Sequence, residues 1–305
     1  MILHILRLSI LCLPLLLRAQ SAPVLSLDAE NIPGKLPQRF RTCEDPIKVK
    51  LEQPPSLKGL RELHISGSAQ FSEDELSAIL KKLPTDRKIT VVDLRQESHG
   101  FINGIAVSWR IEKNLINLGK TLAEVEADEK SRLAEVRKEK EVSIYRTQPR
   151  APQGKIIPES AMTVVVSSVM TERELCQKKN LSYLRVPVTD KRKPDDGQVD
   201  RFVTFAAAFP ENEWIHFHCR AGSGRTTTFM AMYDMMHNAK DVPLCDIIIR
   251  QYLIHGRNLF DLPEESNWDY EQKKERKEFL TKFYEYCRQN APAFKTSWSG
   301  WSAKH

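Results

Sequence analysis

Short apolar runs alternate with amphipathic segments along most of the 305-residue chain. Four runs have the length and apolar content of buried strands, and they occupy residues 60–65, 89–94, 183–188 and 214–218. The first run is followed by Ser66-Gly67-Ser68, which we interpret as the exit from that strand. Apolar positions at helical spacing follow three of the runs, in residues 72–83, 199–206 and 229–236. Strands that alternate with helices predict an α/β fold with a mostly parallel central sheet flanked by helices.

Further signals refine this pattern. Two capping boxes indicate helix starts, one at Ser72 with Glu75 and one at Thr171 with Glu174. Apolar positions from Leu115 to Val136 predict one long, highly charged helix with a solvated face. Short β-like segments lie before and after that helix, at residues 106–109, 142–145 and 163–166. We expect these segments to form a small separate sheet.

The N-terminal segment differs from the rest of the chain. An apolar run from Leu8 to Leu17 follows Arg7, and it is shorter than the roughly 20 residues that a membrane span needs. We interpret residues 1–22 as a signal peptide that exports the protein to the periplasm or the extracellular space. The alternative is that the run is retained as an N-terminal membrane anchor. If the run is removed as a signal peptide, no stable membrane association is expected.

Charge and cysteine content exclude some function classes. The chain has 46 basic and 40 acidic residues, and loss of Arg7 and Arg18 with the signal peptide would lower its formal charge from +6 to +4 (6 − 2). Basic clusters with interleaved aromatic residues are missing from the sequence, so we expect no nucleic-acid partner. The six cysteines form no CxxC pair, so no zinc site is predicted. Buried single cysteines are favoured over disulfides among Cys43, Cys176, Cys245 and Cys287.

The strongest chemical signal lies between the run 214–218 and the following helix. This segment reads His218-Cys219-Arg220-Ala221-Gly222-Ser223-Gly224-Arg225-Thr226. A strand, a glycine-containing loop and a helix together point backbone N–H groups and a helix N-terminus at an anion. Those donors also favour the thiolate form of Cys219, which makes it a candidate nucleophile. Arg225, six positions later, can grip two phosphate oxygens with its planar guanidinium.

The nine residues resemble the signature of the cysteine-dependent protein tyrosine phosphatase superfamily. The resemblance implies that His218 orients the cysteine and that Thr226 offers its hydroxyl to the thiolate. It also implies that the phosphate is bound by the backbone of the loop residues Arg220, Ala221, Gly222, Ser223 and Gly224. Neither a metal nor another cofactor is expected, because Arg225 and the loop N–H groups would neutralise the phosphoryl group.

Several other segments resemble the bacterial PTP-like phytases, which dephosphorylate inositol polyphosphates. They are 35–37 with 40–42, 63–68, 93–100, 187–190 and 214–228. The resemblance implies a tyrosine-phosphatase-like core with a small partial β-barrel. We therefore expect a lead-in at 23–37 and a phosphatase domain at 38–290. The barrel would comprise about 38–52, 100–112 and 140–170, and 291–305 would form a C-terminal tail.

Cysteine attack also needs a proton donor for the leaving oxygen. Asp190 follows the run 183–188 and begins a polar loop, a place where aspartate is also common simply as a turn residue. In the family, the Asp of the matching Thr-Asp pair is the general acid, and Asp195 and Asp196 are the rivals if the register slips. The expected activity is hydrolysis of inositol polyphosphates through a phosphocysteine, at mildly acidic pH.

Outer pocket residues rest on the resemblance alone, and they are Arg41, Asp93, His99, Lys155 and Lys191. Gln251 could position the hydrolytic water, or could lie on a helix surface. Family phytases usually have His where this chain has Lys191, and an acidic residue where it has Arg220. The sequence neighbours of Trp268 are acidic, where the family supplies lysines.

These departures leave rival readings open. A protein tyrosine or phosphoinositide phosphatase could use the same loop. A catalytically silent phosphate-binding module is disfavoured because Cys219, Arg225 and Asp190 are all present. A thiosulfate-type sulfurtransferase would not need Arg225 or a separate acid.

Overall fold

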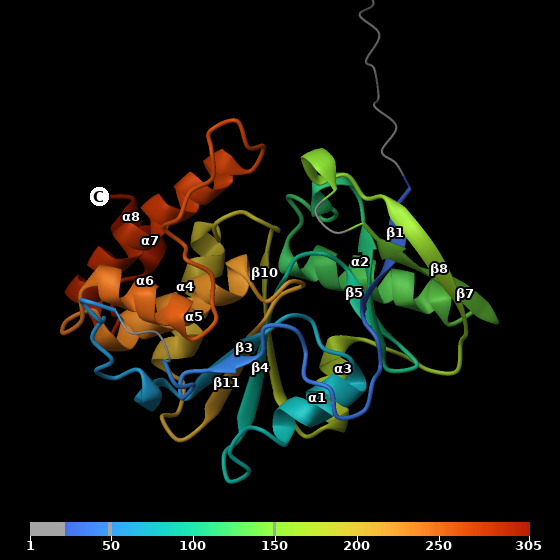
Figure 1. The fold of residues 1–305 in the computed structure, drawn as a ribbon, viewed down its shortest axis with the longest axis horizontal. Coiled ribbons are helices and arrows are strands. Elements are labelled where there is room, and N and C mark those ends of the chain that lie inside the picture. Colours follow the sequence, from blue (N-terminus) through green and yellow to red (C-terminus); the bar gives the residue numbers. More distant parts are fainter. Residues whose placement is uncertain (1–21, 48–50, 149–150) are drawn as a thin grey trace, which may run out of the picture.

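The computed structural model describes residues 22–47, 51–148 and 151–305, and it contains two sheets (Figure 1). All but the last residue of the expected signal peptide lies outside these described residues. Within them, no helix is both long and apolar enough to span a membrane.

The central sheet has five strands in the order β10-β4-β11-β3-β2. Strands β10 (Ser182–Val188), β4 (Ile89–Arg95), β11 (Trp214–His218) and β3 (Ile65–Ser68) are parallel, and β2 (Arg41–Thr42) is antiparallel to β3. The α/β fold with a mostly parallel sheet is therefore confirmed. Because His218 is in register with both Ser68 and Asp93, β3 and β11 end side by side at the cysteine loop and β4 continues two residues past them.

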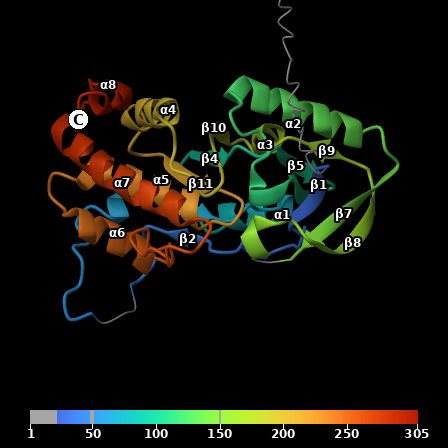
Figure 2. The same ribbon diagram turned by 90° about the horizontal axis from the view of Figure 1, so that it is seen from above.

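Helices cover the central sheet on both sides (Figures 1 and 2). One group comprises α4 (Asp196–Ala207), α5 (Gly224–Asn238), α6 (Leu244–Leu253), α7 (Tyr270–Asn290) and α8 (Trp298–Ser302). The other comprises α1 (Glu73–Leu80) and α3 (Glu172–Lys178), and both predicted capping boxes are present at the starts of these two helices. The stripe Phe229, Met232, Tyr233 and Met236 of α5 is buried in the core, as its spacing predicted.

The second sheet has six strands in the order β8-β7-β1-β6-β5-β9. They are β8 (Pro158–Val165), β7 (Glu141–Thr147), β1 (Val24–Ala29), β6 (Ile105–Arg110), β5 (His99–Ile102) and β9 (Val169–Met170). The small separate sheet is thus present, but its strand pairing does not confirm a partial barrel. Helix α2 (Leu122–Val136) packs on it through the buried Leu133 and Val136. This helix is shorter than expected, since Leu115 and Leu118 precede it.

The strand expected at 60–65 was wrong. Residues Arg61–Leu63 form a 3-10 helix, His64 has a left-handed φ of 51°, and β3 comprises the residues that read as a loop. The serine hydroxyls of β3 are buried but satisfied, because Ser66 Oγ lies 2.9 Å from His216 Nδ1 and Ser68 Oγ lies 3.1 Å from His216 Nε2. A polar strand is stable inside the protein when its side chains are hydrogen-bonded in this way.

Three expected boundaries also differ from the structure. The lead-in 23–37 contains β1, which pairs with β6 in the six-stranded sheet. The segment 38–52 contributes β2 to the central sheet instead of to the β subdomain. The C-terminal segment 291–305 contains α8, whose Trp298 and Trp301 are buried against α7.

The five cysteines among the described residues are all free, but the expectation that they are buried fails for Cys245. Cys43, Cys176, Cys219 and Cys287 are buried, while Cys245 is exposed.

Candidate active site

The loop between β11 and α5 turns around Cys219, which is buried at the edge of a cavity. The hydroxyl of Thr226 donates a hydrogen bond to Cys219 Sγ at 3.2 Å, so Thr226 lies where the sequence motif predicted. Loop carbonyls face away from the thiol: Ala221 O accepts from Arg39 at 2.7 Å, and Gly222 O accepts from Arg41 at 2.9 Å. Because each peptide unit is planar and trans, these bonds turn the following N–H groups toward the cavity side.

Gly222 is required by the path of the loop. Its φ is +64°, and a Cβ at this position would lie 2.3 Å from Ala69 N and 2.5 Å from the carbonyl carbon of Ser68. Both atoms are backbone and cannot move aside, so only glycine fits.

Arg225 is buried, and its guanidinium is held by a carboxylate that sequence reasoning did not single out. Nη1 lies 2.7 Å from Glu97 Oε2, and Nη2 lies 2.9 Å from Glu97 Oε1. Burial favours the neutral acid, but the charges of Arg225 and Arg95 outweigh burial and hold the pKa of Glu97 well below its usual range. This bidentate pair fixes the plane of the Arg225 guanidinium beside the loop.

Asp190 lies at the same cavity, two residues after β10 ends. Its Oδ1 is 3.1 Å from Arg225 Nη2, and its Oδ2 accepts a hydrogen bond from Asn114 Nδ2 at 3.2 Å. The two rivals lie elsewhere, because Asp195 caps α4 and Asp196 accepts a hydrogen bond from Trp298 Nε1 at 2.7 Å. The structure therefore brings Asp190, and neither rival, together with Cys219 and Arg225.

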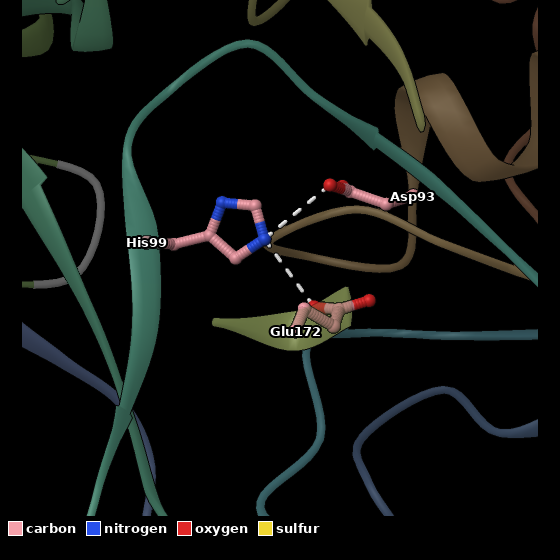
Figure 3. Close-up of side chains that lie close together, drawn as sticks. All are labelled: Asp93, His99 and Glu172. Carbon is pink, nitrogen blue, oxygen red and sulfur yellow. Dashed lines mark ion pairs between the residues drawn. The ribbon is translucent and has the colours of Figure 1, made fainter. Parts of the chain in front are cut away.

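His218 lies behind the loop and is fully buried. Its Nε2 is 2.6 Å from Glu172 Oε1. Figure 3 shows His99 between Glu172 and Asp93, and its Nε2 is 3.3 Å and 3.4 Å from their carboxylate oxygens. Asp93 and His99 are thus buried behind the loop, so the expectation that they line the pocket was wrong. Both were assigned to the pocket by resemblance, and sequence alone does not distinguish the two sides of the loop.

The side chains of Asp93, His99 and Glu172 lie as close together as the ligands of a metal site. Existing charges already compensate the carboxylates, however, since Arg185 Nε lies 3.2 Å from Asp93 Oδ2 and His218 pairs with Glu172. Burial lowers the pKa of His99, but Asp93 and Glu129 outweigh burial and raise the pKa to about 10. Burial likewise opposes ionisation of Glu172, yet His218 and His99 lower its pKa to about 2. We interpret the group as a buried ion-pair network.

Two arginines join the loop to its surroundings. Arg41 is fully buried and donates from Nη2 to Thr227 Oγ1 at 3.0 Å, so it supports the loop from outside. The expectation that Arg41 lines the cavity was therefore wrong. Arg220 lines the cavity, and its Nε donates to Asp28 Oδ1 at 2.7 Å. Asp28 belongs to β1 and also pairs with Arg95 at 2.9 Å. A strand from the N-terminal segment is therefore fastened to the cysteine loop.

The cavity has a volume of about 520 Å³ and a basic lining. Nine lysines and arginines face it: Arg110, Lys113, Lys155, Lys191, Arg220, Arg225, Arg257, Lys273 and Arg276. Asp190 and Asp269 are its two acidic residues. Lys155 and Lys191 thus lie where they were expected, as do Arg220, Ala221, Ser223 and Gly224, while Gly222 faces Ser68 and Ala69.

Sequence reasoning missed part of this lining. Arg110 and Lys113 lie three positions apart, Arg257 and Arg276 come from two other segments, and none of the four carries a local motif. Lys273 could have been found, because it lies one helical turn after Asp269, and its Nζ is 2.7 Å from that carboxylate. Of the acidic neighbours of Trp268, only Asp269 lines the cavity. Gln251 is buried in α6 and donates to Asp234 at 2.9 Å, so neither role proposed for it fits.

Known proteins resemble both the sequence and the fold. Residues 92–237 match the family model PTPlike_phytase, described as inositol hexakisphosphate. The PTP-like myo-inositol phosphatase from Mitsuokella multacida, in complex with myo-inositol-(1,3,4,5)-tetrakisphosphate, is 37% identical with a TM-score of 0.87, over 93% of this chain and 48% of that chain. A PTP-like phytase from Bdellovibrio bacteriovorus is 31% identical with a TM-score of 0.71, over 93% of this chain and 96% of that chain.

Effector protein hopD2 of Pseudomonas syringae pv. tomato is 29% identical over 267 residues. That match covers 87% of this chain and 56% of the effector. The chain therefore spans about half the length of the Mitsuokella protein and of the effector, but nearly all of the Bdellovibrio phytase.

Proposed function

The chain belongs to the PTP-like phytase family, and from this premise we propose that it hydrolyses phosphate monoesters of inositol polyphosphates with Cys219 as the nucleophile. The observation that carries the proposal is the convergence of Cys219, Arg225 and Asp190 on one basic cavity. A catalytically silent binding module would not need an acid beside the thiol and the guanidinium.

In the first step, the Cys219 thiolate attacks phosphorus and forms the S–P bond. The bond between phosphorus and the inositol oxygen breaks, and the leaving oxygen takes the proton of Asp190. Arg225 and the loop N–H groups stabilise the charge that develops on the three equatorial oxygens. Glu97 holds the Arg225 guanidinium in one plane. In that plane the guanidinium can contact two oxygens of the phosphoryl group at once.

In the second step, water attacks phosphorus as the Asp190 carboxylate accepts its proton. The S–P bond breaks, phosphate leaves, and Cys219 returns as a thiolate. The hydroxyl of Thr226, 3.2 Å from Sγ, donates to this thiolate and makes it a better leaving group.

The cavity lining supports a substrate with several phosphates. One phosphate occupies the Cys219 loop, while basic side chains such as Lys113, Lys155 and Arg257 remain to bind phosphates elsewhere on the ring. Charge-assisted bonds from lysine and arginine are stronger than neutral ones, so a crowded inositol ring gains more from this cavity than a phosphotyrosine peptide does.

Phosphate release tests the proposal directly. We expect purified protein in EDTA to release phosphate from inositol hexakisphosphate with a higher kcat/KM than from a phosphotyrosine peptide. A peptide preference would replace the substrate assignment with that of a protein phosphatase, and activity only with added metal would contradict the cysteine mechanism.

We also propose export of the protein, on the strength of the apolar run that follows Arg7. N-terminal sequencing of protein recovered outside the cytoplasm should then show a chain that begins near residue 20 or 23. A chain that retains Met1 in that fraction would contradict the proposal.

A further inference from the structure

The loop that carries Asp190 is tied to the C-terminal part of the chain through the next residue, Lys191. Lys191 has a left-handed φ of 63°, so the chain turns directly after Asp190. Its Nζ lies 3.7 Å from the centre of the Trp268 ring and 3.4 Å from Asp269 Oδ2. One ammonium group thus contacts an aromatic face and a carboxylate of the same short segment.

The backbone of this loop is held by the same part of the chain. Arg276 of α7 is buried, and its Nη2 donates to Lys191 O at 2.5 Å and to Arg192 O at 3.2 Å. These bonds fix the peptide units that follow Asp190. The Asp190 carboxylate itself has two contacts from other segments, the ion pair with Arg225 Nη2 at 3.1 Å and the hydrogen bond from Asn114 Nδ2 at 3.2 Å.

The Trp268 ring is packed beyond its contact with Lys191. A Cβ added at Gly154 would lie 3.1 Å from two carbon atoms of that ring, so the ring lies against the chain that leads into β8. Asp269 is bound on its other oxygen by Lys273 Nζ at 2.7 Å. Trp268 and Asp269, the two partners of Lys191, are therefore each held by a contact that does not involve Lys191.

We propose that Lys191 and Trp268 are positioning residues that form a latch and hold Asp190 at the cavity. The proposal rests on the proposed function, because it presupposes that Asp190 delivers the proton to the leaving oxygen. The competing role for Lys191 is direct contact with a substrate phosphate. Its ammonium is already shared between Trp268 and Asp269, which favours the latch.

The two roles predict different kinetics. A misplaced acid lowers kcat when the leaving oxygen needs a proton, and has much less effect on an aryl phosphate whose leaving group departs as an anion. A lost phosphate contact raises KM for inositol hexakisphosphate instead. The ratio of kcat on an alkyl phosphate to kcat on p-nitrophenyl phosphate therefore reports on the latch.

The experiment compares Lys191→Met and Trp268→Ala with the matched variants Lys191→Arg and Trp268→Phe. We expect that ratio to fall about tenfold in the first pair and to stay within about twofold of the wild type in the second pair. We also expect Lys191→Met to add little to the loss caused by Asp190→Asn, because both changes remove the same proton transfer.

The latch would be overturned if Lys191→Met and Trp268→Ala lowered kcat equally on the alkyl phosphate and on p-nitrophenyl phosphate. A change in KM alone in these variants would also overturn it. Glycerol 2-phosphate and inositol hexakisphosphate both serve as alkyl substrates. If the wild type cleaves glycerol 2-phosphate but leaves inositol hexakisphosphate intact, the substrate assignment fails and the latch is judged on glycerol 2-phosphate. If the wild type cleaves no phosphate ester, the latch fails together with the proposed function.

Discussion

On the cavity side of the Cys219 loop, nine lysines and arginines face two aspartates, whereas behind the loop each buried carboxylate lies close to a cation. The buried side is compensated, so its charges stabilise one arrangement of the strands that carry the loop. The cavity side is only partly compensated: Lys113, Lys155 and Arg257 form no ion pair within the described residues, so they remain available to an anionic ligand. The difference separates charges that position the loop from charges that would bind the substrate.

Among substitutions on the cavity side, Cys219→Ser should have the largest effect on kcat. We expect kcat to fall by at least about a thousandfold, because a serine hydroxyl in this loop is too weakly acidic to attack phosphorus. Binding of inositol hexakisphosphate, measured by calorimetry, should persist because the cations are unchanged. Turnover at the wild-type rate would remove Cys219 from the mechanism.

Asp190→Asn should be the next largest change. We expect kcat on inositol hexakisphosphate to fall about a hundredfold, and kcat on p-nitrophenyl phosphate to fall much less. Stopped assays on both esters at the same pH measure this contrast. The same factor on both substrates would exclude Asp190 as the proton donor.

Glu97→Gln breaks the contact between the two sides. The amide keeps the shape of Glu97 but removes the charge that Arg225 and Arg95 share, at 2.7 Å and 3.0 Å. We expect a loss of about 3 kcal/mol in the free energy of unfolding and a fall in kcat of at least about tenfold. Urea denaturation and phosphate release measure the two effects, and an unchanged kcat would show that Arg225 needs no orienting partner.

The buried side should respond to alkaline pH through His99. Its pKa is raised to about 10 in the folded protein, compared with a usual value of about 6.5. Protonated His99 therefore contributes its full stabilisation below about pH 6.5, and this contribution is lost as the pH rises through about 10. We expect the free energy of unfolding to fall by about 3 kcal/mol between pH 7 and pH 10. His99→Gln should lack this component, and an identical pH dependence in wild type and variant would contradict the assignment.

The smallest expected effect comes from one cation of the cavity. Lys155→Ala should raise KM for inositol hexakisphosphate about threefold with little change in kcat, because it removes one of several phosphate contacts. Lys240→Ala is the control, since Lys240 is exposed and lies outside the cavity lining. An equal change in both variants would indicate that only net charge matters.

Sequence patterns predicted the features that depend on neighbouring residues. The positions of Cys219, Thr226 and Arg225 follow from one strand, one turn and one helix start, so a nine-residue motif was enough. Capping boxes succeeded for the same reason. In each case the decisive contacts join residues only a few positions apart.

Features that depend on distant contacts were beyond sequence reasoning. Ser66 and Ser68 read as loop residues, because their partner His216 lies 150 and 148 positions away. Asp93 and His99 were placed in the pocket, whereas the fold puts them on the opposite side of the loop. The cations Arg110 and Arg276 meet at the cavity only because two separate segments pack around it.

The contact between Asp28 and the cysteine loop makes the position of that loop depend on β1, a strand near the N-terminal end of the chain. A protease that trimmed the chain up to Val24 would leave β1 whole, and Asp28 would still pair with Arg95 and Arg220. A cut a few residues later would withdraw that carboxylate from both guanidinium groups, and it would also disrupt the pairing of β1 with β6, which ends at the cavity residue Arg110. We therefore expect a chain trimmed before Val24 to keep the anchor of the cysteine loop, and a chain trimmed within β1 to lose it.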